Sequence, residues 1–184
     1  NIGVSICTNG TLIDMEWARG LAQYDKIHFN VSLDGFRVSS HGRFRGMTKL
    51  TFTQLLQTLR ALGEQKLLNG ILTTPNKYAS IDEYVELCQF AKEVGAKYVL
   101  MNPLSPFGRG VQTQSLSYSE EDMSALKRQT LPIISDYFEI VYIRFPNTNG
   151  LPIGKCPLGA IPYIFCNGDI AICPYMVFAA SGSH

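Results

Sequence analysis

Two kinds of hydrophobic pattern follow one another along the first 145 residues. Short apolar runs rich in β-branched residues predict strands at residues 4–8, 27–33, 67–73 and 98–101. Apolar residues recurring every three or four positions predict helices at about residues 14–24, 52–62, 80–95 and 119–137. Strands that alternate with helices are typical of repeated βα units around a parallel sheet. The pattern therefore predicts an α/β fold, either an open doubly wound sheet or an arc of a barrel, since four strands are too few to close one.

Capping and breaking residues set the expected ends of these helices. Asp14 and Ser119 are N-cap candidates, and the run Ser80-Ile81-Asp82-Glu83 is typical of a capping box. Gly63 is expected to end the second helix, because a glycine commonly follows the last helical turn. Pro132 is expected to kink the last helix, since proline cannot supply the backbone N–H of a helix interior.

The composition and hydrophobic pattern of the sequence change near residue 140. Residues 140–145 can form one more strand, and residues 146–162 are rich in Pro, Gly and Asn, which predicts a loop. Asn167-Gly168 then lies between two short apolar runs, a pattern that favours a tight β-hairpin.

Three segments are expected from this pattern. Residues 1–145 would form a partial (β/α) barrel, and residues 146–180 would begin a small cysteine-bearing module. Residues 181–184 are small and polar and have the composition of an expression scar, while the start at Asn1 reads as cut or processed.

Composition narrows the class of protein. The 184 residues are 46% hydrophobic and 17% charged with a net charge of +1, which is typical of a globular domain. No run of one charge points to a nucleic-acid partner, and no apolar run reaches the roughly 20 residues of a membrane helix. Five cysteines, an odd number without a signal peptide, argue against a disulfide framework and favour the cytoplasm.

The predicted strand at 27–33 has one polar face, because His28, Asn30, Ser32 and Asp34 alternate with apolar residues. A parallel strand covered on both faces is normally apolar throughout. Two interpretations remain open: a strand lining the polar interior of a barrel arc, or an edge strand with one face in solvent.

Polar and glycine-bearing segments follow every predicted strand: Thr8-Asn9-Gly10, Ser32-Leu33-Asp34-Gly35, Thr73-Thr74-Pro75-Asn76 and Asn102-Pro103. Ligands of parallel α/β folds bind at the carboxyl ends of the strands, and Ser, Thr and Asn there can bond a ribose or a base. The same residues are also common in ordinary turns.

Two of these segments resemble the third and fourth strands of the radical S-adenosylmethionine (SAM) enzymes, and a third motif after them strengthens the resemblance. They are Thr8-Asn9-Gly10-Thr11-Leu12, Ser32-Leu33-Asp34-Gly35 and His41-Gly42-Arg43-Phe44-Arg45-Gly46. The last is similar to a His-x-x-x-Arg-Gly element of the branch that modifies peptides or matures cofactors.

The resemblance implies a TIM-like barrel arc that binds SAM. It implies cofactor-binding roles for Thr8, Asn9, Ser32 and Asp34, with Ser32 near the SAM ribose. Arg45 would bind the methionyl carboxylate, which a guanidinium can hold with two parallel charge-assisted bonds. Arg43 competes for that role, and either arginine could instead be a solvated loop residue.

Cys156, Cys166 and Cys173 form a second group, in which Cys156 precedes a Gly-x-x-x-x-Cys element ending at Cys173. This spacing resembles the opening of the SPASM/twitch extension, which implies an auxiliary [4Fe–4S] cluster bound by Cys156 and Cys173. Cys166 would be an extra ligand or a bystander. Zinc is a rival, although no Cys-x-x-Cys pair supports it.

The 184 residues contain no Cys-x-x-x-Cys-x-x-Cys motif, which carries the catalytic [4Fe–4S] cluster in the family. The expectation is therefore a fragment of an enzyme that reductively cleaves SAM and acts on a peptide or small molecule, inactive by itself. No catalytic acid or base stands out. The alternatives are a non-catalytic α/β binding module and a zinc- or cluster-bearing interaction domain. An exposed sheet edge would favour a dimer.

Overall fold

A computed structural model describes residues 2–104, 108–143 and 162–172. The chain divides into two compact units, Asn1–Arg144 and Phe145–His184.

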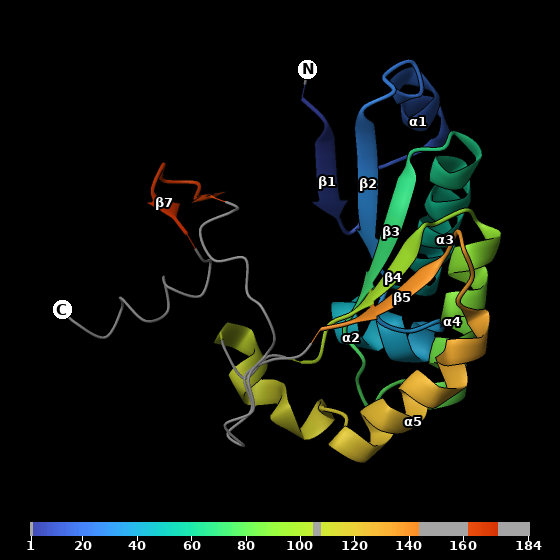
Figure 1. The fold of residues 1–184 in the computed structure, drawn as a ribbon, viewed down its shortest axis with the longest axis vertical. Helices are drawn as coiled ribbons and strands as arrows, with labels where there is room; N and C mark the ends of the chain where they lie inside the picture. Colours follow the sequence, from blue (N-terminus) through green and yellow to red (C-terminus); the bar gives the residue numbers. More distant parts are fainter. Residues whose placement is uncertain (1, 105–107, 144–161, 173–184) are drawn as a thin grey trace. The chain divides into compact units, whose positions relative to one another are not determined.

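The first unit is built on one five-stranded parallel sheet (Figure 1). Its strands are β1 (Val4–Thr8), β2 (Ile27–Ser32), β3 (Leu68–Thr73), β4 (Tyr98–Met101) and β5 (Glu139–Tyr142). They lie in the order β1-β2-β3-β4-β5, and each adjacent pair is parallel. The sequence pattern predicted four of these strands in the sheet; the fifth is β5, which pairs with β4 through Val99↔Ile140 and its neighbours.

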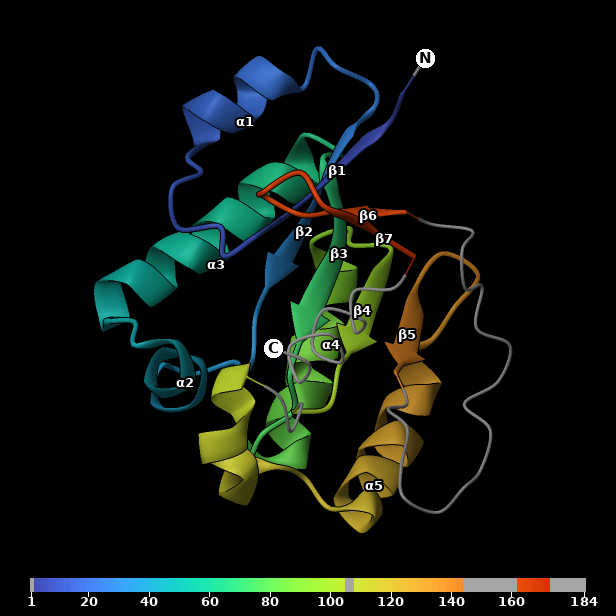
Figure 2. The same cartoon turned by 90° about the vertical axis from the view of Figure 1, so that its left-hand side faces the viewer.

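Helices cover one face of this sheet (Figure 1). The helices are α1 (Met15–Leu21), α3 (Lys49–Glu64), α4 (Ile81–Glu93) and α5 (Glu120–Thr130). Figure 2 looks toward the other face, along which the strands follow one another in chain order. A doubly wound sheet reverses its strand order and carries helices on both faces, whereas a barrel arc does neither. The prediction of a partial (β/α) barrel arc is thus confirmed.

A single core fills the space between the sheet and the helices. β2 contributes Phe29 and Val31 to it, and α3 contributes Leu55, Leu59 and Leu62, all at most 1% exposed. These α3 residues recur at helical spacing, while the β2 residues alternate along the strand, so each element buries one apolar face.

Side-chain caps begin the helices where the sequence predicted them. The Asp14 carboxylate accepts a hydrogen bond from the Trp17 backbone N–H at 2.8 Å. Ser119 and Asp122 form a reciprocal capping box at the start of α5. Ser80 caps α4 through the Glu83 backbone N–H, but the Glu83 carboxylate bonds elsewhere, so only half of that predicted capping box forms.

Three predicted helix ends were wrong. Helix α3 runs through Gly63 to Glu64, and a Cβ on Gly63 would lie 1.9 Å from the Val94 carbonyl oxygen, so this glycine serves close packing. Helix α1 ends at Leu21 rather than near Tyr24. Helix α5 ends at Thr130, and the 3₁₀ turn η3 (Leu131–Ile133) with Pro132 follows, so the proline ends the helix instead of kinking it.

Three short helical segments were not predicted from the sequence pattern. They are η1 (Val38–Gly42), α2 (Arg43–Arg45) and η2 (Gly108–Leu116). The first two follow β2 and lie beyond the carboxyl ends of the strands (Figure 1).

In the second unit the described residues form an antiparallel hairpin of β6 (Tyr163–Ile164) and β7 (Ile170–Ala171). Gly168 has a φ of +89°, which its position in the tight turn requires, so the predicted Asn-Gly hairpin is confirmed. Within the described ranges, no helix has the length and apolar character needed to cross a membrane.

Candidate functional site

The polar segments after the strands converge at one edge of the sheet. The register pairs Thr8 with Val31, Ser32 with Leu72 and Thr73 with Met101, so the carboxyl ends of β1 to β4 lie next to one another. The elements η1 and α2 lie at this same end. The residues predicted to bind a ligand therefore belong to one neighbourhood.

Asp34 forms the centre of this neighbourhood. Its side chain is fully buried, and Oδ2 lies 2.5 Å from Nε of Arg45. The other oxygen, Oδ1, accepts a hydrogen bond from the Thr74 backbone N–H at 2.8 Å. Both oxygens of the buried carboxylate therefore have donors, one of them cationic, as a buried charge requires.

The backbone of Asp34 is bonded equally well. Its N–H donates to Nδ1 of His41 at 2.9 Å. Its carbonyl oxygen accepts from Nδ2 of Asn76 at 3.1 Å and from the hydroxyl of Tyr84 at 3.0 Å. Asp34 thus links β2 to the segment after β3, to η1 and to α4, and has little freedom to move.

His41 is a neutral, fully buried imidazole. Burial lowers the pKa of His41 from 6.5 to about 4; Asp34 opposes this shift, and Arg45 adds to it. Nδ1 accepts the Asp34 N–H, so the proton of the neutral ring is assigned to Nε2, which has no hydrogen-bond partner among the described residues. The ring packs beside Phe52 of α3, with 5.7 Å between the ring centroids, so His41 connects the segment after β2 to α3.

Glu83 of α4 stabilises the loop that follows β2, at residues 33–42. Its Oε1 accepts from the Phe36 backbone N–H at 2.5 Å and from the Ser40 hydroxyl. A Cβ on Gly35 would lie 2.8 Å from Cβ of Ser40, so the loop closes tightly around this carboxylate. These bonds explain why the Glu83 side chain does not return to Ser80.

The two candidate arginines have different surroundings. The guanidinium of Arg43 lies over the Tyr78 ring at 4.2 Å from its centroid, a cation–π contact. Arg45 instead bonds to Asp34, and its side chain is 38% exposed. Of the two, Arg45 is the one that the fold connects to the strand ends.

Thr8 and Asn9 make short-range turn contacts. The Thr8 hydroxyl accepts from the Gly10 N–H at 3.1 Å, and Oδ1 of Asn9 accepts from the Thr11 N–H at 3.2 Å. Ser32 ends β2 with a half-buried side chain. The structure brings Asp34 and Arg45 into contact. The assignment of Thr8, Asn9, Ser32, Asp34 and Arg45 to a ligand stays a prediction.

The sheet face opposite the helices carries a hydrogen-bonded row centred on Asn30. Its amide donates to the Ser5 hydroxyl at 2.8 Å, and its Oδ1 accepts from Tyr98 at 2.7 Å and from Asn69 at 3.2 Å. Asn30 is only 6% exposed and lies on an internal strand. The polar face of β2 is therefore the inner face of the arc, and the edge-strand interpretation was wrong.

A glycine makes room for this row. A Cβ on Gly70 would lie 2.4 Å from Cζ of the Tyr98 ring. The tyrosine ring therefore lies across β3 and reaches Asn30 on β2 only because position 70 has no side chain.

The cysteines do not converge within the described residues. Cys156 and Cys173 lie outside them, so their predicted cluster role is untested. Cys166 is free and exposed, and the described parts of the chain hold no group of three or more potential metal ligands. Cys88 is buried in the core, where burial raises the pKa of its thiol to about 12.

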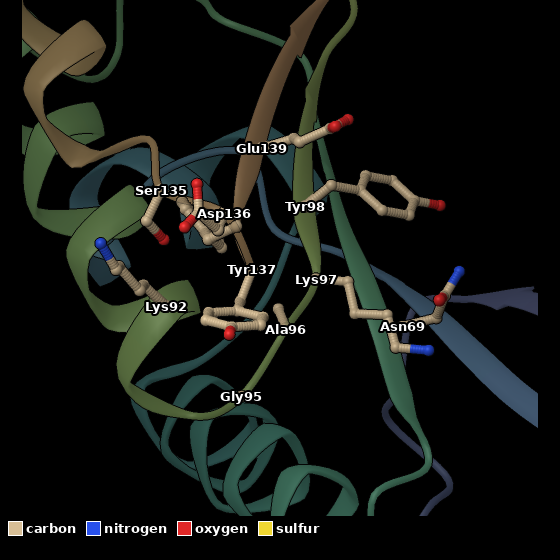
Figure 3. Close-up of a pocket in the computed structure, with 11 residues that line it drawn as sticks. Asn69, Lys92, Gly95, Ala96, Lys97, Tyr98, Ser135, Asp136, Tyr137 and Glu139 are labelled. Carbon is tan, nitrogen blue, oxygen red and sulfur yellow. The ribbon is translucent and has the colours of Figure 1, made fainter.

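The described residues also form an open hollow of about 770 Å³, at the opposite end of the sheet (Figure 3). It is lined by residues from the amino ends of β4 and β5 and the carboxyl end of α4, with Lys92 and Asp136 on its rim. Lys92 is already bonded to the Ile133 carbonyl at 2.7 Å. The hollow is remote from the Asp34 neighbourhood, and ligand sites of this fold lie at the other end.

Sequence reasoning missed the structural roles of His41, Glu83 and Tyr84. From the sequence, His41 was a motif residue near the predicted ligand end and Glu83 a helix-capping residue, while Tyr84 had no predicted role at the site. Their contacts with Asp34 or its loop span 7 to 50 positions, and no local pattern reports them. The one available signal was the carboxylate of Glu83 in the first turn of a helix.

No protein-family model matches the chain. An AdoMet-dependent heme synthase from Methanosarcina barkeri is 32% identical over 114 residues, which are 62% of this chain and 32% of that enzyme. Mycofactocin maturase MftC from Mycobacterium tuberculosis is 32% identical over 111 residues, 60% of this chain and 27% of the maturase. The chain thus spans about a third of the length of these curated relatives.

Solved structures share the fold. Streptococcus suis SuiB bound to S-adenosylmethionine superposes with a TM-score of 0.72 at 17% identity, covering 96% of this chain and 43% of SuiB. SuiB bound to precursor peptide SuiA gives a TM-score of 0.71 at 18% identity, with the same 43% of SuiB covered. These relatives and neighbours are radical SAM enzymes, so the chain is similar to that family in sequence and fold over the part that it spans.

Proposed function

We propose that this chain is part of a radical SAM enzyme that modifies a peptide or matures a cofactor. The observation that carries the proposal is the pair of Asp34 and Arg45 at the carboxyl ends of the strands. A partly exposed guanidinium anchored there suits the carboxylate of an amino-acid ligand. The half-buried hydroxyl of Ser32, two positions before Asp34, suits the ribose.

The proposed substrate class is taken from the relatives of the chain. They are named as a heme synthase and a mycofactocin maturase, and SuiB was solved with a precursor peptide. We extend peptide or cofactor substrates to this chain on that likeness alone.

The residues present fit SAM but not the catalytic cluster. Arg45, Ser32 and the strand-end amides supply the donors that a carboxylate and a ribose need. A catalytic [4Fe–4S] cluster would need three clustered thiolates, and the 184 residues hold no Cys-x-x-x-Cys-x-x-Cys motif. The proposal therefore assigns that cluster, which supplies the electron for SAM cleavage, to cysteines outside this sequence.

Three finer assignments belong to the same proposal. Cys156 and Cys173, with Cys166 as an additional thiolate, would bind an auxiliary [4Fe–4S] cluster, and the odd cysteine count supports a reducing cytoplasmic location. The outer edge of β1 would pair with a second copy of the chain, because β1 is an edge strand of the described sheet. The auxiliary cluster predicts iron and sulfide in anaerobically reconstituted chain, and zinc without sulfide would refute it.

The SAM assignment is tested by titrating the 184-residue chain with SAM and following backbone amide chemical shifts. Ser32→Ala should weaken SAM binding about tenfold, the loss expected for one hydrogen bond to the ribose. Arg45→Ala should weaken it by about tenfold or more, because it removes two charge-assisted bonds to the carboxylate. Arg43→Ala is the matched control, since Arg43 stacks on Tyr78. Equal affinity in all four proteins would refute the assignment.

A further inference from the structure

We infer that Asp34 is a positioning residue that fixes Arg45 so that a ligand carboxylate is bound end-on by the two Nη groups of the guanidinium. The inference rests on the proposed function and specifies how the site takes its ligand. Asp34 would not contact the ligand and would act through Arg45.

The contact between Asp34 and Arg45 uses one particular edge of the guanidinium. A guanidinium can hold a carboxylate side-on, through Nε and one Nη, or end-on, through both Nη groups. In this structure Nε of Arg45 is 2.5 Å from Oδ2 of Asp34. The side-on edge is therefore occupied, and the end-on edge is the one that remains for a ligand.

Asp34 is held in one position by its hydrogen bonds. Its side chain is fully buried, its Oδ1 is held by the Thr74 N–H, and its own N–H is held by His41. The carbonyl oxygen is held by Asn76 and Tyr84. A ligand carboxylate that displaced Asp34 from Nε would leave a buried anion without its cation, which is strongly unfavourable.

The end-on edge of the Arg45 guanidinium is the one left for a ligand. The Arg45 side chain is 38% exposed, and none of the hydrogen bonds found among the described residues involves its Nη atoms. Its guanidinium lies 5.9 Å from the centroid of the Phe44 ring, which restricts the movement of the Arg45 side chain on one side. Arg45 is thus fixed at Nε and open at Nη, an arrangement that is ready for ligand before ligand arrives.

The arrangement predicts a dependence on the ligand carboxylate alone. Replacing Asp34 by Asn places an amide donor or a neutral oxygen against Nε, so the guanidinium loses its anchor. Asp34→Asn should then weaken binding of SAM about tenfold, because the guanidinium, no longer held at Nε, does not present both Nη groups to the carboxylate. Decarboxylated SAM keeps the nucleoside, sulfonium and amine, so its affinity should change less than twofold.

The test combines those two titrations with a reading that needs no ligand. In ¹⁵N spectra of the unliganded chain, the Arg45 Nε–H should exchange slowly with water and should broaden or vanish in Asp34→Asn. In the Arg45→Gln background, Asp34→Asn should bring no further loss of SAM affinity. The matched control is Glu86→Gln, which removes the carboxylate from the exposed Arg37–Glu86 pair, also at 2.5 Å.

The outcomes separate the two proposals. Loss of the Arg45 Nε–H signal together with a selective loss of SAM binding supports the inference. Equal weakening for both ligands, additive losses in the double variant or an unchanged Nε–H signal would overturn it. If the unaltered chain binds neither ligand while the Nε–H signal still depends on Asp34, the SAM assignment fails, and with it the end-on role, but the anchoring of Arg45 stands.

Discussion

His41 is buried without exposure to solvent, although histidine is charged in water at mildly acid pH. Burial lowers the pKa of its imidazole from 6.5 to about 4. The unfolded chain therefore takes up a proton near pH 6.5, while the folded chain resists protonation until about pH 4. Since protons bind the unfolded state more readily between these values, acid shifts the balance toward unfolding.

The free energy of unfolding should consequently fall as the pH drops from 6.5 to about 4, by up to roughly 3 kcal/mol from this one group. Urea denaturation across pH 4 to 7 measures this slope. Asparagine can accept the Asp34 N–H without titrating, so His41→Asn should flatten the slope in that range. An equally steep slope in His41→Asn would assign the acid sensitivity to other groups.

The hydroxyl of Tyr84 is also buried at the site. It donates to the Asp34 carbonyl and accepts from the Asn76 backbone N–H at 2.9 Å, and burial raises the pKa of this phenol far above its usual range. Tyr84→Phe would leave the Asn76 N–H buried and unpaired, so we expect a loss of about 1–3 kcal/mol of stability. Thermal or urea denaturation reports it.

Tyr118→Phe is the matched control for that change. The Tyr118 hydroxyl donates to the Ala79 carbonyl at 2.7 Å in a half-buried setting, where water can replace it. A loss in Tyr84→Phe no larger than that in Tyr118→Phe would mean that the Asn76 N–H finds another partner.

At the scale of single elements, β3 and β4 depend on one glycine. Gly70→Ala would push its Cβ to 2.4 Å from the Tyr98 ring, so the ring must move and its bond to Asn30 must break. We expect a loss of about 1–3 kcal/mol, as for other overpacked sites, measured by urea denaturation.

Gly20 is the control for Gly70, because a Cβ there meets nothing within 4 Å. It lies inside α1, where alanine is favoured over glycine by about 0.5–1 kcal/mol. Gly20→Ala should therefore be neutral or stabilising. A destabilised Gly20→Ala would show that the cost at position 70 is not specific to Tyr98.

Elements were predictable from the sequence where local signals decide them. The strand at Tyr98–Met101 follows from its short apolar run, and the caps at Asp14 and Ser119 follow from capping chemistry. Gly63 could not be assigned correctly, because only the approach of Val94 shows why it is glycine. The site was predictable in part: the motifs pointed to Asp34 and Arg45, but their contact spans 11 positions and depends on η1 and α2.

At the scale of the whole molecule, the sequential strand order leaves β1 and β5 at the two edges of the described sheet. The free edge of β1 carries Val4, which is 47% exposed. If copies pair along this edge, Val4→Lys should shift the chain from dimer toward monomer, because an edge lysine opposes strand pairing. Light scattering after size-exclusion chromatography measures the change in mass.

Val111→Lys provides the control for that experiment. Val111 is 60% exposed in η2, away from any strand, so a lysine there adds the same charge without touching the edge. A monomeric unaltered chain, or equal behaviour of the two lysine variants, would refute pairing through β1.

The bonds at Asp34 also bear on the order in which the chain folds. They join position 34 to residues 40, 42 and 50 places further along, Thr74, Asn76 and Tyr84. Contacts of such sequence separation require closure of long loops and form slowly compared with helix turns. We therefore expect the ligand end to be completed late, after β2 and β3 have paired and α4 has docked. Substitutions at Asp34 should accelerate unfolding while leaving the rate of folding nearly unchanged.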